Sequence, residues 1–158
     1  MQKTTAYINI GSNMGDRRAN IGRAVALISE SVGEPSGVSR VVESEPWGYE
    51  SANRFLNIGI VVDTDLAPEE LLDRLQAVER AISPESHRDA NGAYIDRLID
   101  VDLIVYGGVV VDTPRLKVPH PHMAQRRFVL EPLAELLPDW HHPCTGLTVA
   151  DMMASLQD

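Results

Sequence analysis

The stretch from Arg97 to Tyr106 holds the residues best suited to chemistry, two aspartates separated by a single valine. Its β-branched composition predicts a strand, and side chains on a strand alternate between two faces. Asp100 and Asp102 therefore point to the same face. The opposite, core-facing row would hold Ile99, Val101, Leu103 and Val105. Two neighbouring carboxylates suit Mg²⁺, which commonly binds one or two carboxylates together with substrate phosphates. Two solvated aspartates that protect an edge strand from aggregation are the alternative.

A second stretch, residues 113–130, contains no acidic residue, although the chain as a whole is acidic. Its basic and imidazole side chains are Arg115, Lys117, His120, His122, Arg126 and Arg127. Of the 14 basic residues in the chain all but Lys3 and Lys117 are arginine, and the planar guanidinium fits phosphate oxygens well. The pattern indicates a site for an anionic group, with a solvated basic surface as the alternative.

Length and composition fit one domain, residues 1–158, with a real hydrophobic core, since 44% of the 158 residues are hydrophobic. The formal net charge of −9 argues against generic nucleic-acid binding. The single Cys144 cannot form an internal disulfide, and neither a signal peptide nor an apolar stretch of ~20 residues is visible. We therefore expect a cytoplasmic protein that does not bind membranes, and a monomer is the simplest state.

Local patterns divide the chain into strands and helices. Alternating apolar residues predict strands over residues 4–10, 38–45 and 55–64, before the aspartate strand. Apolar stripes of helical spacing predict helices, which begin at an Asp16 N-cap and at Pro68. These helices, with two shorter ones near the C-terminus, cover residues 16–32, 68–82, 126–137 and 147–156. Gly107 and Gly108 predict a tight hairpin to residues 109–111, and prolines predict an extended segment over residues 115–122.

The order strand, helix, strand, strand, helix, strand predicts an α+β fold, a ferredoxin-like split βαβ sandwich. Its antiparallel sheet would carry the helices on one face, and the other face would stay open for a ligand. The aspartates should lie on this open face, because Ile99, Val101 and Leu103 face the helices. Asn57, in the middle of a strand, is either a buried amide that recognises a ligand or a solvent-facing residue.

Five motifs, in their order and spacing, resemble a known family. They are YINIGSN at residues 7–13, FLN at 55–57, RLIDVDL at 97–103, LKVPH at 116–120 and RRFVLEPL at 126–133. Together they are similar to the 6-hydroxymethyl-7,8-dihydropterin pyrophosphokinases of folate biosynthesis, over nearly the whole chain. The Walker and Rossmann phosphate-binding motifs are absent from the sequence.

The resemblance implies transfer of the β,γ-pyrophosphoryl group of ATP to the hydroxymethyl oxygen of a dihydropterin, with release of AMP. Asp100 and Asp102 would then hold two Mg²⁺ ions, and Arg88 and Arg97 would join them in the catalytic set. The expected ATP-binding residues are Gln76, His87, Arg88, Arg97, Leu103, Arg115, Leu116, Lys117, His120 and Arg126. The expected pterin-binding residues are Gly11, Ser44, Glu45, Pro46, Trp47, Phe55, Asn57, Tyr94 and Phe128. Tyr94 and Phe128 would stack on the two sides of the flat pterin.

The chain departs from the family pattern in the long polar connector before the aspartate strand. Many members carry Gly-Arg-x-Arg there, whereas residues 83–88 read SPESHR, so that only Arg88 and His87 can replace the usual arginines. Long connectors of this kind are often functional lids, and we expect residues 83–95 to close over ATP. Two other functions are open from the residues alone: a ligand-binding module without chemistry, and a different nucleotide-dependent phosphotransferase or nucleotidyltransferase.

Overall fold

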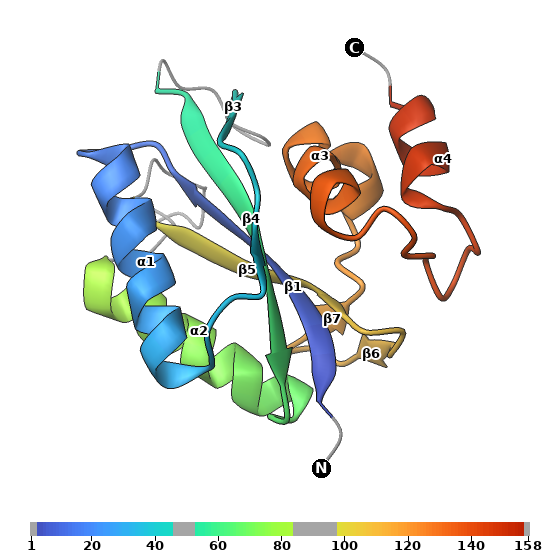
Figure 1. Cartoon of the computed structure of the whole chain (residues 1–158), viewed down its shortest axis with the longest axis horizontal. Helices are drawn as coiled ribbons and strands as arrows, with labels where there is room; N and C mark the ends of the chain where they lie inside the picture. Colours follow the sequence, from blue (N-terminus) through green and yellow to red (C-terminus); the bar gives the residue numbers. More distant parts are fainter. Residues whose placement is uncertain (1–2, 46–52, 84–97, 157–158) are drawn as a thin grey trace.

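The computed structural model describes residues 3–45, 53–83 and 98–156. Its centre is a five-stranded antiparallel sheet in the order β2-β4-β1-β5, with β3 also paired to β4 (Figure 1). These strands are β1 (Thr4–Ser12), β2 (Gly37–Val38), β3 (Val42–Ser44), β4 (Phe55–Thr64) and β5 (Asp100–Tyr106). In the described part of the chain, β5 is an edge strand of this sheet.

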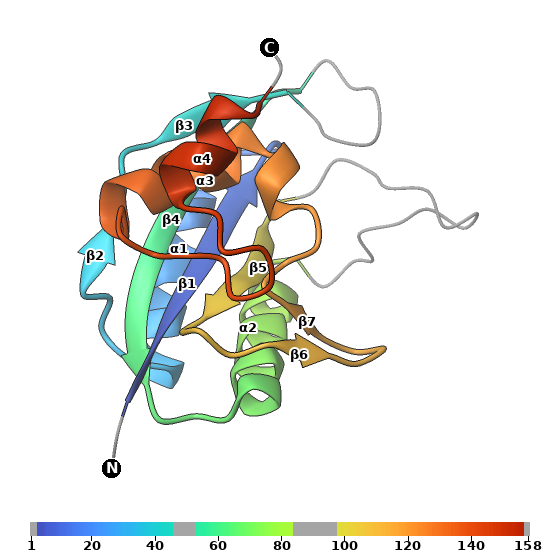
Figure 2. The ribbon, with the colours of Figure 1, turned by 90° about the vertical axis from the view of Figure 1, so that its right-hand side faces the viewer.

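Helices cover both faces of the sheet (Figures 1 and 2). One face packs against α1 (Arg17–Ser31) and α2 (Pro68–Ile82), and the other against α3 (Arg127–Leu136) and α4 (Val149–Ala154). A short 3-10 helix, η1 (Met123–Gln125), precedes α3. The prediction that helices lie on only one face is therefore wrong, because part of the second face is apolar and is buried under α3 and α4.

The first core cluster fixes the α1 and α2 side of the sheet. Ile8 and Ile10 of β1 and Ile58 and Ile60 of β4 are buried there against apolar side chains of both helices. The predicted start of α1 is confirmed, since the Asp16 carboxylate accepts the Ala19 N–H at 3.1 Å. An N-cap of this kind stabilises a helix by about 1 kcal/mol.

The predicted core-facing row of β5 is correct for Ile99, Val101 and Leu103 and wrong for Val105. Leu103 pairs with Ile8 of β1, but Val105 pairs with Tyr7, so that Ile104 is an extra residue on β5. Such a β-bulge reverses the alternation of side chains beyond it. Val105 consequently joins the second cluster, on the same face as the aspartates.

Two other strand predictions need correction. The single strand expected over residues 38–45 is divided into β2 and β3. The break follows Ser39, whose hydroxyl accepts the Gly59 N–H at 2.8 Å and so replaces a carbonyl of the ladder. Residues 109–111 do not form a hairpin with the aspartate strand, because β6 (Val111–Asp112) pairs instead with β7 (Lys117–Val118).

Within the described residues, no helix combines the length and the apolar character needed to cross a membrane.

Candidate active site

Two rows of residues cross the three neighbouring strands β5, β1 and β4 on the face that α3 partly covers. Directly opposite residues of antiparallel strands share a face. In the first row Asp100 lies opposite Gly11, which lies opposite Asn57. The second row consists of Asp102, Asn9 and Gly59. The two carboxylates therefore stand next to each other at the β5 end of adjacent rows.

The aspartate pair fits Mg²⁺ by the chemistry of its donors. Asp100 and Asp102 are both half-buried and project from the same face of one strand. Carboxylate oxygens are hard ligands that Mg²⁺ accepts when phosphate oxygens and water complete its octahedral shell. Such a site needs a phosphate-binding region beside it, and basic side chains do lie next to Asp102.

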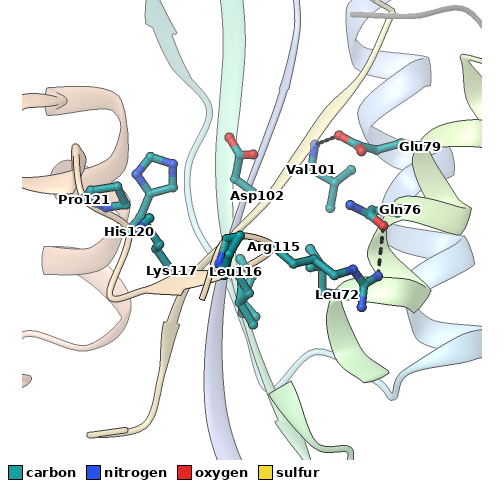
Figure 3. Close-up of a pocket in the computed structure, with 12 residues that line it drawn as sticks. Leu72, Gln76, Glu79, Val101, Asp102, Arg115, Leu116, Lys117, His120 and Pro121 are labelled. Carbon is teal, nitrogen blue, oxygen red and sulfur yellow. Dashed lines mark hydrogen bonds between the residues drawn. The ribbon is translucent and has the colours of Figure 1, made fainter. Parts of the chain in front are cut away.

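A cavity of about 310 Å³ opens beside Asp102, along the edge of β5 that faces away from β1 (Figure 3). Its lining residues are Leu72, Gln76, Glu79, Val101, Asp102, Leu103, Pro114, Arg115, Leu116, Lys117, His120 and Pro121. Figure 3 shows the Asp102 carboxylate between the His120 ring on one side and Gln76 and Glu79 of α2 on the other. The cavity thus brings together the described residues predicted for ATP, except Arg126.

Backbone groups of β5 point away from β1, toward the side of the strand on which this cavity lies. The Val101 N–H donates to the Glu79 carboxylate at 2.8 Å, and the Ile104 carbonyl accepts the His120 N–H at 2.8 Å. Backbone groups of alternate residues on an edge strand point in the same direction, and Ile104 departs from this rule because it is the extra residue of the bulge. The N–H and C=O of Leu103, two residues after Val101, therefore also point away from β1 and toward the cavity.

His120 is held as a neutral ring with a defined tautomer. Its Nδ1 accepts the His122 N–H at 3.1 Å, so that the proton of the neutral imidazole lies on Nε2. Burial, followed by the positive charges of Arg126 and His122, lowers the pKa of His120 to about 4, although Asp100 acts in the opposite direction. At neutral pH the ring can donate one hydrogen bond without adding a charge.

The basic side chains of the predicted site differ in their surroundings. Arg115 is exposed, forms an ion pair with Asp73 and donates to Gln76 Oε1 at 3.4 Å. The Lys117 ammonium pairs with Asp112 at 2.5 Å, across the β6–β7 hairpin. Exposed pairs of this kind contribute little to stability, so these side chains can exchange partners at small cost.

Arg126 and Phe128 lie at the start of α3. The Arg126 guanidinium carbon is 5.7 Å from the centroid of the Phe128 ring, within the range of a cation–π contact. Phe128 is half-buried against the second core cluster, and its carbonyl accepts the Asn9 side-chain N–H at 3.0 Å. This hydrogen bond connects the first turn of α3 to the second row of the sheet, to which Asn9 belongs.

Asn57 is a buried amide, which excludes the solvent-facing alternative; its recognition of a ligand stays a prediction. Asn57 is 2% exposed, and its Nδ2 donates to the Val42 carbonyl at 3.1 Å and to Ser44 Oγ at 2.8 Å. A Cβ on Gly11 would lie 2.8 Å from Asn57 Oδ1 and 3.3 Å from a carbon of the Phe55 ring. These residues, all predicted for the pterin, therefore meet at the end of the first row.

Six predicted site residues lie outside the described residues, namely Pro46, Trp47, His87, Arg88, Tyr94 and Arg97. The predicted lid over residues 83–95 lies outside them as well, apart from Ser83, and stays a prediction. Glu45 is described and is exposed.

Two residues of the site were missed in the sequence. Glu79 lies three residues after Gln76, and residues with this spacing share one face of a helix, so the predicted role of Gln76 could have indicated it. Asn9 is a polar residue within an otherwise apolar strand, with the same parity as Gly11. Its link to Phe128 joins residues 119 positions apart, and no local pattern predicts such a contact.

A mixed α/β fold with a basic cavity beside a pair of carboxylates is typical of an enzyme that uses a phosphorylated nucleotide. Residues 7–138 match the family model for 7,8-dihydro-6-hydroxymethylpterin-pyrophosphokinase (HPPK). The chain therefore belongs to the HPPK family, the ATP-using enzymes that transfer pyrophosphate to a hydroxymethyldihydropterin in folate biosynthesis. The resemblance noted in the sequence is confirmed.

Similar proteins agree with this family. A 2-amino-4-hydroxy-6-hydroxymethyldihydropteridine pyrophosphokinase from Porphyromonas gingivalis is 38% identical over 138 residues, which are 87% of this chain and 92% of that protein. The protein of the same name from Pseudomonas aeruginosa is 40% identical over 151 residues, covering 94% and 90% of the two chains.

Solved structures show the same fold at low sequence identity. A crystal structure of an HPPK-DHPS protein in complex with substrates has a TM-score of 0.77 at 13% identity, over 98% of this chain. The wild-type HPPK-DHPS of Plasmodium falciparum has a TM-score of 0.75 at 14% identity, over 97% of this chain. This chain spans 43% and 44% of the lengths of those two proteins.

Proposed function

We propose that the cavity beside β5 binds ATP, and that the aspartate pair and the open part of the sheet face carry out the transfer to a dihydropterin. The hydroxymethyl oxygen attacks the β-phosphorus of ATP while the bond to the oxygen between the α- and β-phosphorus breaks. AMP leaves with that bridging oxygen, and the hydroxyl proton is released. Phosphoryl transfer of this kind depends on positioning and electrostatics, so the chain needs no covalent nucleophile.

The edge of β5 supports a binding mode for the adenine base. The outward N–H and C=O of Leu103 form an alternating donor and acceptor pair, as the edge of a purine does. Leu72 and Leu116 provide apolar walls to the same cavity, and Gln76 and Arg115 lie at its α2 side. Adenine bound there would place the triphosphate toward Asp102 and His120, which also line the cavity.

Asp100 and Asp102 would hold two Mg²⁺ ions, whose chemistry is to neutralise charge on the attacking and leaving oxygens and to orient the phosphates. His120 supports this arrangement as a neutral donor from Nε2, which binds a phosphate oxygen without opposing the metal charge. Arg126 adds a fixed positive charge close enough to His120 to depress its pKa. We assign Arg97, Arg88 and His87 to the same phosphates by the family resemblance alone.

The pterin would lie across the first row, next to the aspartates. Asn57 offers its Oδ1 at the position where Gly11 leaves space, and its amide orientation is fixed by Val42 and Ser44. Phe55 lines one side and the Phe128 ring would stack on the pterin. Tyr94, Glu45, Pro46 and Trp47 complete this proposed pocket from the family resemblance.

The proposal also covers the fold type, the number of domains, the oligomeric state and the location in the cell. A ferredoxin-like classification is supported by the antiparallel order β2-β4-β1-β5 with α1 and α2 as the two crossovers. A single domain over residues 1–158 is supported by the two core clusters, which share one sheet. A monomer and a cytoplasmic location fit the acidic composition and the single cysteine.

The observation that carries the proposal is the position of the aspartate pair between a basic cavity and a buried amide slot. The test is product analysis with purified protein, ATP and Mg²⁺. We expect AMP to form only when 6-hydroxymethyl-7,8-dihydropterin is added. Formation of ADP, or AMP formation that does not depend on the pterin, would refute the proposal.

A further inference from the structure

Helix α3 contains a proline in its interior, Pro132. In an α-helix each carbonyl accepts the N–H of the residue four positions later. Proline has no N–H, and its ring also crowds the carbonyl of the residue four positions earlier. The carbonyl that loses its helical donor is that of Phe128, the ring proposed to stack on the pterin.

The Asn9 side chain takes the place of the missing donor. Its Nδ2 donates to the Phe128 carbonyl at 3.0 Å, across from β1 to the first turn of α3. Asn9 is 4% exposed, and a buried amide of this kind stabilises a structure only when it is hydrogen-bonded. The two groups therefore depend on each other. The Phe128 carbonyl lacks its helical donor, and the buried Asn9 amide needs a partner within the protein, so each supplies the hydrogen-bond partner of the other.

Gly59 allows α3 to come close enough for this contact. It lies opposite Asn9 in the second row, and a Cβ there would lie 2.5 Å from the Tyr7 ring and 2.8 Å from the Cβ of Pro132. The proline ring therefore rests on the backbone of β4. The height of the first turn of α3 above the sheet is therefore set by Pro132, Asn9 and Gly59.

We propose that Asn9 is a positioning residue for the pterin site, which acts through the backbone of Phe128. Asp102 is the neighbour of Asn9 in the same row, so the tether fixes the Phe128 ring relative to the aspartate pair. Arg126, in contact with that ring, is held by the same turn. The inference rests on the proposed role of Phe128 in pterin binding.

The neighbouring Tyr7 offers a comparison, although a hydrogen bond with Asn9 also acts on its hydroxyl. Its hydroxyl donates to the Val129 carbonyl at 2.7 Å, one residue further along α3. Burial raises the pKa of Tyr7 above its usual value, so that the phenol stays a neutral donor. This tether joins the same strand to the same helix, but Tyr7 belongs to the second core cluster. The Val129 carbonyl also has a helical donor, the Leu133 N–H, because both residues lie within α3.

The test measures the affinity for 6-hydroxymethylpterin by fluorescence, with Mg²⁺ and a non-hydrolysable ATP analogue at saturation, in Asn9→Leu, Tyr7→Phe and the unmodified protein. Loss of one hydrogen bond corresponds to about a fivefold to tenfold change. We expect the pterin Kd to rise by about that factor in Asn9→Leu and to change less than twofold in Tyr7→Phe. The Kd of the ATP analogue should change less than twofold in both variants.

A double-mutant cycle with Pro132→Ala tests the link without any ligand. The alanine restores an N–H at position 132, so the Phe128 carbonyl regains a helical donor. We expect Asn9→Leu to lower the urea midpoint by less in the Pro132→Ala background than in the native one. If Asn9→Leu alone fails to fold, the double variant should fold, and its failure to do so would overturn the proposal.

Other outcomes distinguish a failure of the positioning role of Asn9 from a failure of the proposed pterin site. An unchanged pterin Kd in Asn9→Leu would refute a positioning role for Asn9. If Phe128→Ala binds the pterin as tightly as the unmodified protein, the assignment of Phe128 to the pterin is wrong and the positioning role is refuted with it. A tenfold weaker ATP analogue in Asn9→Leu would show that the residue acts on the nucleotide instead.

Discussion

One face of the central sheet has two halves of opposite character. The covered half is apolar and lies under α3 and α4; its residues are Tyr7, Val61, Ile104 and Val105. The open half is polar or lacks side chains and borders the proposed substrates; its residues are Gly11, Asn57, Asp100 and Asp102. The same three strands contribute to both halves, so the difference lies in the side chains rather than in the architecture.

The boundary between the halves follows from local features. On β1 and β4 it is the row of Asn9 and Gly59, where α3 rests on the sheet. On β5 it is the bulge at Ile104, which turns Val105 to the side of Asp102. A carboxylate placed under α3 would be desolvated at high cost, whereas the open half keeps its carboxylates half-buried. Stability and activity should therefore respond to different halves.

The largest effect is expected in the open half. Asp100→Ala and Asp102→Ala should each lower kcat by about 10³-fold, since a metal contributes several kcal/mol and each 1.36 kcal/mol is tenfold in rate. The urea midpoint should hardly change. Asp63→Ala is the control, because Asp63 is an exposed carboxylate that accepts from Thr5 at the far end of the same sheet. A variant of either site aspartate with near-normal turnover would contradict the metal assignment.

In the covered half we expect a large loss of stability and no change in catalysis. Leu133 of α3 is fully buried in the second cluster, and Leu133→Ala should lower the free energy of unfolding by about 3 kcal/mol, a typical value for a buried leucine. The kcat and both KM values should stay unchanged at temperatures where the variant is folded. If catalysis fell in parallel with stability, the two halves would not be separable and the comparison would fail.

A smaller effect is expected where the open half is proposed to recognise the pterin. In Gly11→Ala the new methyl group would lie 2.8 Å from Asn57 Oδ1, so the amide must move. The pterin KM should rise about tenfold, which corresponds to ~1.4 kcal/mol, while the ATP KM stays within twofold. Gly22→Ala in α1 is the control, since a Cβ there meets nothing within 4 Å. Equal changes in both KM values would argue against a separate pterin slot.

Much of this division can be predicted from the sequence, because it rests on strong local patterns. The alternation around Asp100 and Asp102 predicts their common face, and the helical stripes predict α1 and α2. The sequence does not reveal that Val105 changes face, since a bulge depends on the pairing with Tyr7. It also does not reveal that α3 covers half of the sheet, because that contact requires residues more than a hundred positions apart to meet.

The site shows the same limit. The family resemblance indicates Gln76, His120 and Asn57, but it does not give the hydrogen bonds that orient them. The buried state of Asn57 depends on Val42 and Ser44, which follow the break after Ser39. Glu79 and Asn9 contact backbone groups, and residue types do not show where a backbone group will lie. Residues proposed to contact substrate are therefore easier to infer from the sequence than the residues that hold them in place.

The last expected effect is confined to acidic pH and concerns His120, which lies where the halves meet, since its N–H donates to the Ile104 carbonyl. Its pKa is lowered from the ordinary 6.5 to about 4, mainly by burial. Between these values the unfolded chain binds a proton that the folded protein does not. The contribution of His120 to the free energy of unfolding is therefore complete above pH 6.5 and is lost as the pH falls to about 4.

Replacement by a group that does not titrate isolates this contribution. His120→Gln should reduce the slope of unfolding free energy against pH in that window and leave the slope above pH 7 unchanged. The ring signals of His120 in NMR spectra of the folded protein should show no titration near pH 6.5. A midpoint near 6.5 would mean that water reaches the ring freely and that His120 belongs wholly to the open half. The neutral Nε2 donor proposed for the phosphates would then lose its basis, because the ring would gain a proton within the physiological range.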